Sequence, residues 1–350
     1  MEPCRRCAGG TSAPHFRLSF LWDFGTLVGG TFVSGTPLTQ GAGWKGELIE
    51  GNLVTQTKSR QTREMVSKAR LEESGRFRLA LGLIILGAGA ALVALLGPLV
   101  GDVIRYHASD GAINQIIGGD VAGLVLVAPV SILAGILVWR GHLAGPILAM
   151  GPAVYALYMY SQLALGNDIS RYAGNSERFF PLYIGLFMLA GAIAIRSWTM
   201  IDIEALPVTR RWVARTLGIF FLIVAAFLVF GLHVPGLIDA WADQPTSTEY
   251  LADPAVFWLV KFMDLGIVVP ALMLAGIGTL RNRPWVAKIS YAGVGWAALL
   301  GASVAGMAIV MQATGDPAAT LANTVAFSGF ASVAVVMAVV VYLPLMRGDV

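Results

Sequence analysis

Lys261 and Asp264 are charged residues that lie well inside a long apolar stretch, residues 255–279. Because residues three apart share one face of a helix, the two side chains can pair with each other. A functional interpretation makes Asp264 a proton or cation site that faces a polar cavity between helices. A structural interpretation makes it a fixed partner of Lys261, or of a tyrosine from another helix. The sequence leaves both interpretations open.

Other polar groups that could join such a site are Tyr155, Tyr158 and Asp120. The two tyrosines are three residues apart in the stretch 143–165, so their hydroxyl groups lie on one helix face and could donate hydrogen bonds into a helix bundle. Tyrosines in such positions also serve simply as packing and interface aromatics. The candidate intramembrane polar site therefore comprises Asp264, Lys261, Tyr155, Tyr158 and Asp120.

The segment from Pro129 to Arg140 aligns without gaps to the segment from Pro270 to Arg281, with identical residues at six of twelve positions. An acidic residue precedes each proline, Asp120 by nine positions and Asp264 by six. This similarity predicts a direct repeat of four plus four helices, related by an axis along the membrane normal. The alternative is two helices that each need a proline kink. Helix kinks are expected at Pro129, Pro152 and Pro270.

Metal and nucleophile chemistry find little support. Cys4 and Cys7 supply only two of the four ligands that structural zinc requires, and they are interpreted as free thiols. His233 has no second ligand within helical reach, and His142 lies in a tight turn. The chain has no phosphate-binding loop and no metalloprotease or nucleophile-elbow motif, so we expect neither an enzyme nor a cofactor.

Composition indicates which elements must hold these residues. Hydrophobic residues make up 56% of the 350 and charged residues 13%, and the mean hydropathy is +0.71. Soluble domains carry about 25% charged residues, so the composition predicts an all-α membrane protein and argues against nucleic-acid binding. Eight apolar stretches are long enough to cross the bilayer. They are 79–101, 120–139, 143–165, 180–200, 213–235, 255–279, 286–311 and 319–345.

The distribution of basic residues sets the expected orientation. With both termini cytoplasmic, thirteen basic residues flank the inner ends of the stretches and three lie in the outer segments. The inner ones are Lys68, Arg70, Arg76, Arg78, Arg140, Arg196, Arg210, Arg211, Arg215, Arg281, Arg283, Lys288 and Arg347, and the outer ones are Arg105, Arg171 and Arg178. The segment 236–254 carries acidic residues and no basic ones, which suits the outer side.

Residues 1–75 differ from the rest of the chain. Residues 1–78 hold 11 of the 24 Lys and Arg residues. We expect 1–75 to be a polar, poorly ordered tail and 76–350 to be an eight-span domain. Met65 is a plausible start of the functional protein, and the basic stretch 55–74 is either a helix on an anionic membrane surface or a solvated linker.

Two segments resemble a group of uncharacterised polytopic membrane proteins from bacteria and archaea. They are Tyr155 to Gly166 with Phe180 to Phe187, and Asp264 to Gly276 with Arg281 to Trp285. The resemblance covers about residues 79–345 and implies a multi-span bundle in a prokaryotic plasma membrane, without an assigned activity. It marks Tyr155, Tyr158, Asp264 and Pro270 as part of the recurring pattern.

Three classes of function remain at this point. Prolines within the stretches, the repeat and an acid in the membrane predict a small-solute or ion transporter. The alternative is a membrane-embedded sensor or assembly subunit in which the polar pair is structural. A lipid enzyme comes third and would gather Asp168, Arg171 and Glu177 beside Asp120. The expected partners are the lipid bilayer and a small solute or ion, and formation of a homo-oligomer stays open.

Overall fold

A computed structural model describes residues 72–350, except 207–209, 282, 284 and 348–350. All of these residues belong to the second of two units, Glu64–Val350. The expectations for the tail, including a start near Met65 and the thiols of Cys4 and Cys7, fall outside the described residues. Residues 72–75, which were expected in the tail, already belong to a helix.

Seven helices among the described residues are long and apolar enough to cross a membrane. Three of them are Glu72–Leu96, Val286–Ala313 (α11) and Leu321–Arg347 (α12). The other four are composite: Asp110–Trp139 contains α2 (Asp110–Ala122), η1 (Gly123–Val127) and α3 (Ala128–Trp139); Ser176–Met200 contains η2 (Ser176–Phe179) and α5 (Phe180–Met200); Arg211–Ala240 contains α6 (Arg211–Ala226), η3 (Phe227–His233) and α7 (Val234–Ala240); Pro254–Leu280 contains α9 (Pro254–Met263), η4 (Asp264–Val268) and α10 (Val269–Leu280). Helices satisfy every backbone polar group internally, which lipid demands.

The structure also contains α4 (Ala144–Leu165), a 22-residue helix at the position expected for the third span. Its tyrosines and prolines make it less apolar than the other seven, and it is not counted among them. A short helix, α8 (Thr248–Ala252), lies in a connection. The described residues contain no strand.

One expected boundary is wrong in a way that matters for the site. The second span was expected to begin at residue 120, but α2 begins at Asp110, where the Ser109 hydroxyl accepts a hydrogen bond from the Ala112 amide. An N-cap of this kind satisfies one of the free amides of the first turn and sets the beginning of the helix. Asp120 therefore lies about three turns inside the helix.

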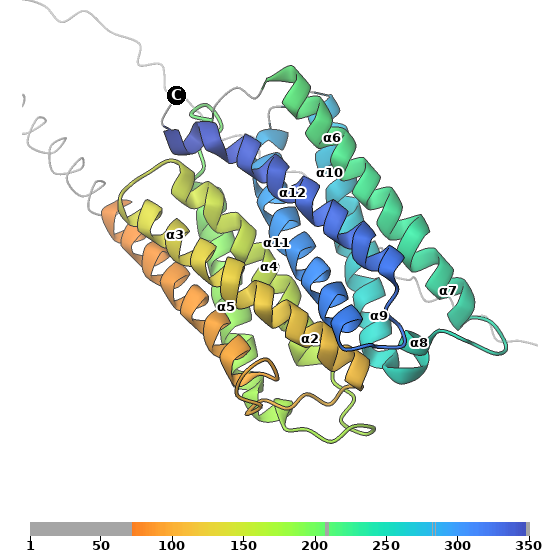
Figure 1. Cartoon of the computed structure of the whole chain (residues 1–350). Coiled ribbons are helices and arrows are strands. Elements are labelled where there is room, and N and C mark those ends of the chain that lie inside the picture. The colour runs from red at the N-terminus through yellow and green to blue at the C-terminus, as the bar shows by residue number, and fades with distance from the viewer. Residues whose placement is uncertain (1–71, 207–209, 282, 284, 348–350) are drawn as a thin grey trace, which may run out of the picture. The chain divides into compact units, whose positions relative to one another are not determined.

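The helices pack as two groups joined by α11 (Figure 1). In the first group, α4 packs on α3 and α5, and the Ser131 hydroxyl of α3 donates to the Leu83 carbonyl of the Glu72–Leu96 helix. In the second group, α10 packs on α6, and α11 packs on α12. The buried apolar residues form two clusters. One, around Leu83 and Tyr183, lies in the first group. The other, around Phe221 and Val294, extends into α3 and α4 of the first group through Leu137, Ile147 and Met150.

Helix α11 joins the groups because it packs on both α2 and α4. Glycines allow this close approach. A Cβ atom added at Gly118 of α2 would lie 2.4 Å from the backbone N and Cα of Met307, and one added at Gly151 of α4 would lie 3.2 Å from the Gly295 carbonyl carbon. Small residues at helix crossings are typical of membrane bundles, in which packing replaces the hydrophobic effect as the main attraction.

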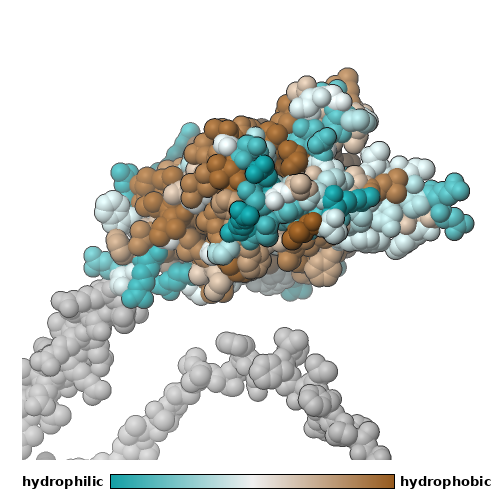
Figure 2. Space-filling model, turned by 90° about the horizontal axis from the view of Figure 1, so that it is seen from below, coloured by the Kyte–Doolittle hydropathy of each residue, from teal (hydrophilic) through white to brown (hydrophobic). Residues whose placement is uncertain are grey.

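Large apolar side chains cover the outside of the bundle. Trp139, Met188, Ile195, Phe230 and Phe262 are among the most exposed. Seen from below, hydrophilic residues form a patch in the middle of the face, and hydrophobic residues lie beside it (Figure 2). The apolar surface exposed in this way is larger than the apolar patches that soluble monomers expose to water. Together with the seven apolar helices, it identifies a multi-pass membrane protein.

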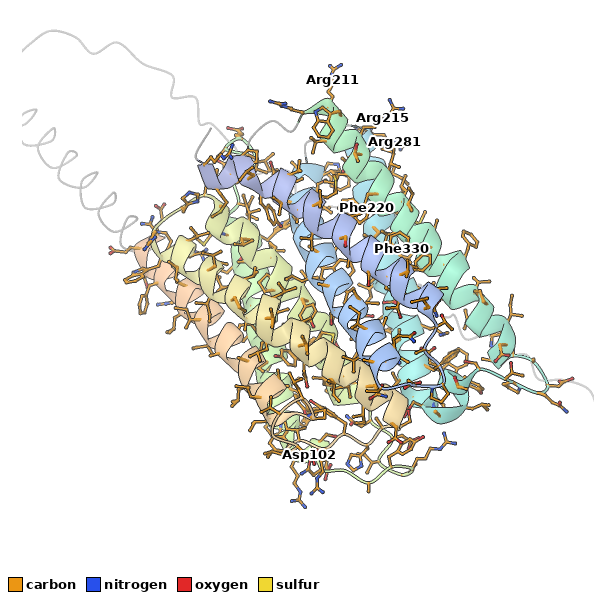
Figure 3. The ribbon with its side chains drawn as sticks, in the orientation of Figure 1. Asp102, Arg211, Arg215, Phe220, Arg281 and Phe330 are labelled. Atoms are coloured by element: carbon orange, nitrogen blue, oxygen red, sulfur yellow. The ribbon has the colours of Figure 1, made fainter. Side chains whose placement is uncertain are left out.

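The two ends of the bundle differ in charge. Arg211, Arg215 and Arg281 lie together at one end, which we call the arginine end, and Asp102 lies at the opposite end (Figure 3). We call the second one the loop end, because the connections 97–109 and 166–175 lie there.

Three helices contain π-helical turns, and each of these turns ends two residues before a proline. The turns η1, η3 and η4 precede Pro129, Pro235 and Pro270. A proline has no N–H group, and its ring clashes with the carbonyl group four residues earlier, so a wider turn relieves the strain. The expected irregularities at Pro129 and Pro270 thus take the form of π turns, whereas α4 continues as an α-helix through Pro152.

Hydrogen bonds between connections hold the loop end together. The His107 ring is 2.7 Å from both the Tyr172 carbonyl oxygen and a Glu177 carboxylate oxygen. The Ser109 amide donates to Asp253 at 3.1 Å, so the link extends to the N-terminus of α9. The protonated imidazole donates at both ring nitrogens and satisfies both acceptors.

This arrangement predicts a pH-dependent stability. The hydrogen bond to Glu177, supported by the one to the Tyr172 carbonyl, raises the pKa of His107. A raised pKa of this sort stabilises the fold fully below the unfolded value of about 6.5 and loses that stabilisation as the pH rises through the folded value. We expect the melting temperature of purified protein to fall between about pH 6 and pH 8.

The matched control for this effect is Glu177→Gln, because Glu177 is 46% exposed and its substitution removes the charge without opening a cavity. This variant should melt lower at pH 6 and show a flatter pH profile than the wild type. An unchanged profile in Glu177→Gln would show that the dependence comes from another group.

Candidate functional site

A cavity of about 690 Å³ lies between the two helix groups. Its described lining comes from the Glu72–Leu96 helix, α2, η1 and α4 on one side and from α6, η3, α9, η4, α10, α11 and α12 on the other, together with residues of connections. Tyr155, Tyr158, Asp120 and Asp264 all contribute to the lining. Four of the five residues proposed from sequence therefore meet around one space, although they come from three different helices.

Asp264 is the centre of a hydrogen-bonded network. The Tyr158 hydroxyl donates to its Oδ1 at 2.7 Å, and His233 Nε2 is 2.8 Å from its Oδ2. The three residues come from α4, η3 and η4, and the two π turns contact each other. His233 is 1% exposed and Asp264 is 6% exposed. The network thus joins the two helix groups deep in the bundle.

The environment of His233 fixes the arrangement of protons in this network. Its second ring nitrogen, Nδ1, is buried and has no hydrogen-bond partner among the described residues. A protonated imidazole would leave a buried N–H group unsatisfied, which is costly. The network is therefore best satisfied by a neutral His233 that donates from Nε2 to an ionised Asp264, an assignment inferred from the hydrogen bonds.

The two tyrosines of α4 have different partners. The Tyr155 hydroxyl donates to the Ser303 hydroxyl of α11 at 3.1 Å. The Tyr158 ring makes an edge contact with Trp296, with centroids 6.5 Å apart. Trp296 also lines the cavity. Sequence reasoning placed both tyrosines on one face, and in the structure that face points toward α11 and the cavity.

Asp120 is buried but has an incomplete set of partners. It is 8% exposed, and its Oδ2 atom has no hydrogen-bond partner among the described residues. A Cβ atom added at Gly97 would lie 2.7 Å from Oδ2, so the carboxylate depends on the glycine for space. Tyr106, which also lines the cavity, lies near this carboxylate. Burial, with smaller contributions from Tyr183 and Asp120, raises the pKa of Tyr106, so its hydroxyl group stays neutral.

The expected pair between Lys261 and Asp264 does not form. The Lys261 ammonium lies over the Phe257 ring, 3.4 Å from the centroid, and both oxygens of Asp264 are bonded to other residues. Lys261 does not belong to the described cavity lining. A position three residues earlier on the helix leaves Lys261 nearer the loop end, where an aromatic face stabilises the cation. Of the two structural interpretations, the tyrosine partner is the one that the structure contains.

Glu177 and the polar residues of connection 166–175 do not gather around Asp120. Arg171 donates to the Ala252 carbonyl, Asp168 accepts from the Ser170 hydroxyl, and Glu177 contacts His107. These residues join connections at the loop end. Within the described part of the chain, no three His, Cys, Asp or Glu side chains come close enough to hold a metal ion.

His233 is the site residue that sequence reasoning missed. It was set aside because no second polar group lies within helical reach, but Asp264 is 31 positions away on a neighbouring helix. The available signal was its position two residues before Pro235, which parallels the acid before Pro270. A polar residue near a proline in a span is thus a candidate site residue even where its own helix offers it no partner.

Comparisons with known proteins add no family assignment. No protein-family model matches the chain, and neither a curated protein nor a solved structure is similar to it. The resemblance described from the segments around Tyr155 and Asp264 stays a prediction. The functional argument therefore rests on the geometry of the cavity and its residues.

Proposed function

We propose that this chain is a transporter of a small solute or ion, and that the solute passes through the cavity between the two helix groups. The observation that carries the proposal is that buried carboxylates, Asp120 and Asp264, line a cavity within an apolar bundle. Acids at membrane depth are expensive, and in transport proteins they form ion and substrate sites.

The shape of the cavity supports a carrier in an outward-open form. Its described lining includes Thr246 to Glu249 and Ala318 to Thr320, which belong to connections near one end. None of the described lining residues comes from connections 201–206 or 140–143 at the arginine end. A cavity that reaches one side only is what alternating access requires of one of its two states.

The packing supports the direct repeat of four plus four helices. The Glu72–Leu96 helix packs on α3 through glycines, as α6 packs on α10 through Gly218 and Gly276. The pair α4 and α5 corresponds to the pair α11 and α12. A π turn before a proline precedes both α3 and α10. In this scheme α4 is the third span along the chain and brings the number of spans to eight. Its neighbours shield it from lipid, so it can carry polar residues.

The proposed orientation places the arginine end in the cytoplasm of a prokaryotic cell and the protein in the plasma membrane. Arg211, Arg215 and Arg281 at that end follow the positive-inside rule. The acidic connection 241–253 lies on the other side in this scheme.

Cysteine labelling in intact cells tests this orientation. In a background with Cys4 and Cys7 replaced by serine, Asp243→Cys should react with a membrane-impermeant maleimide added outside. Glu204→Cys should react only after the membrane is made permeable. Labelling of both positions from the same side would contradict the crossing of the membrane by the Arg211–Ala240 helix and the placement of the ends.

The alternative function is a membrane-embedded sensor or assembly subunit without transport. The observation in its favour is that Asp264 is fully hydrogen-bonded, so the network could serve only to join the two helix groups. A sensor would bind its ligand without moving it across the bilayer.

A flux assay separates the two functions. Purified full-length protein is reconstituted in vesicles and given a panel of labelled cationic, neutral and anionic solutes. We expect saturable uptake of at least one class of solute, at a rate above that of vesicles without protein. Unlabelled solute inside the vesicles should stimulate this uptake. Binding without uptake for the whole panel would favour the sensor.

A further inference from the structure

The charge of the cavity points to the class of solute. Its described lining contains three carboxylates, Asp120, Glu249 and Asp264, and contains no lysine, arginine or histidine. Lys261 lies behind the lining, near Glu249 and Asp264, so the carboxylates still outnumber the cations around the cavity. An excess of negative charge attracts cations and repels anions. This asymmetry makes an anionic solute a poor fit.

The carboxylates differ in what they can still bind. Both oxygens of Asp264 already accept hydrogen bonds, from Tyr158 and His233. Asp120 is more than nine-tenths buried, and its Oδ2 is unpartnered within the described part of the chain. A buried carboxylate without a partner is strongly destabilising, and a cationic donor would remove that penalty. Oδ2 is sealed against Gly97, so the oxygen of Asp120 that a ligand in the cavity can reach is Oδ1, to which no described side chain donates.

The rest of the lining indicates that the cation has an apolar body. Phe220 and Phe330, which Figure 3 marks on α6 and α12, line the cavity together with Trp296 and Phe327. Aromatic faces stabilise cations and also pack against apolar groups. The volume of about 690 Å³ suits a drug-sized molecule. A bare metal ion would need several oxygen ligands at one point, and the described residues provide no such cluster.

We propose that the cavity binds a monovalent organic cation with an aromatic or aliphatic body, and that the Asp120 carboxylate accepts the hydrogen bond of its ammonium group. This inference deepens the proposed transport function and rests on the same cavity. The ammonium lies against Asp120, and the apolar body extends toward Trp296 and Phe330.

Three probes with one apolar body test this proposal. Binding of 3,3-diphenylpropylamine, 3,3-diphenylpropanol and 3,3-diphenylpropanoate to the full-length protein in lipid nanodiscs is measured by calorimetry, with empty nanodiscs as the background. We expect the amine to bind at least tenfold more tightly than the alcohol and the carboxylate to bind most weakly. Equal affinities for amine and alcohol would overturn the proposal.

Substitutions then test the role of Asp120. Asp120→Asn should lower the affinity for the amine at least tenfold and leave the affinity for the alcohol unchanged, which also shows that the cavity is intact. The matched control is Asp110→Asn, the same substitution at an exposed position on the same helix, and it should not alter either affinity. An amine preference that survives in Asp120→Asn would contradict the assignment.

A second variant covers the case in which Asp120→Asn does not fold. Gly97→Ala places a methyl group against Oδ2 of Asp120 and should also reduce the preference for the amine. A full preference in Gly97→Ala would count against the proposal. The results of this assay and of the flux assay can be told apart. Amine binding without uptake would contradict transport and support the proposed class of ligand. Uptake of other solutes without amine binding would support transport and contradict the proposed class of ligand.

Discussion

Asp264→Asn should reduce solute uptake into vesicles at least tenfold while the protein still folds. The amide is the same size as the carboxylate and can still accept from Tyr158 at Oδ1, so the packing between α4 and η4 survives. The substitution removes the negative charge from the cavity lining and changes the hydrogen bond to His233. Uptake depends on that charge if the cavity is the route.

The control for this variant is Lys261→Met on the same helix. Lys261 is buried, 6% exposed, and its ammonium contacts Phe257 outside the cavity lining. Its removal should change uptake less than twofold. If Asp264→Asn keeps full uptake and only lowers the melting temperature, the carboxylate is structural. If instead Lys261→Met abolishes uptake, the Lys261 ammonium is also required for transport although it does not contact Asp264.

Gly118→Ala should destabilise the bundle more than any other single methyl group discussed above. The added Cβ would lie 2.4 Å from the backbone N and Cα of Met307, and backbone atoms cannot turn aside as a flexible side chain can. Helices α2 and α11 must therefore separate. Overpacking of this kind costs about 1–3 kcal/mol, and we expect the upper part of that range because both contacts are to backbone.

The measurement is the melting temperature and the yield of monodisperse protein after extraction. Gly123→Ala is the matched control, because the same substitution one to two turns later on this span meets no atom within 4 Å. Its stability should stay within about 1 kcal/mol of the wild type, since alanine also favours the helical state. Equal behaviour of the two variants would contradict the close crossing of α2 and α11.

The helical fold could be predicted from the sequence because apolar runs of bilayer length have one stable conformation in lipid. The boundaries were less certain. The position of α2 was wrong by ten residues, since the polar segment from Asp110 to Gln115 hides a helical turn behind an unfavourable hydropathy. Polar residues also lower the hydropathy of α4, so it is not one of the seven apolar helices. The sequence predicted this helix correctly, but its hydropathy does not establish it as a span.

Four of the five residues proposed from sequence line the cavity, but their hydrogen-bond partners could not be predicted. Asp264 and Tyr158 stood out because polar groups in lipid-length helices are rare, and the structure brings them to 2.7 Å. The partner His233 depends on how two helices are rotated against each other, which local spacing does not encode. Lys261 was paired wrongly for the same reason, because a shared helix face permits a contact without requiring it.

The π turns could not be predicted from hydropathy. One extra residue in a turn changes the direction of every later side chain. The apolar residues before Pro129 and Pro270 are nevertheless compatible with an α turn as well as with a π turn. The prolines were the correct signal, and the physical reason is the clash of the ring with the preceding turn.

Access to the cavity from both sides of the membrane tests the transport claim most directly. Ala297 lines the cavity from α11, and Ala297→Cys in a background without Cys4 and Cys7 adds only a thiol there. A membrane-impermeant thiol reagent is applied from either side of oriented vesicles, with unreacted protein as reference. Alternating access predicts labelling from both sides and protection by transported solute, whereas labelling from one side alone under every condition would contradict it.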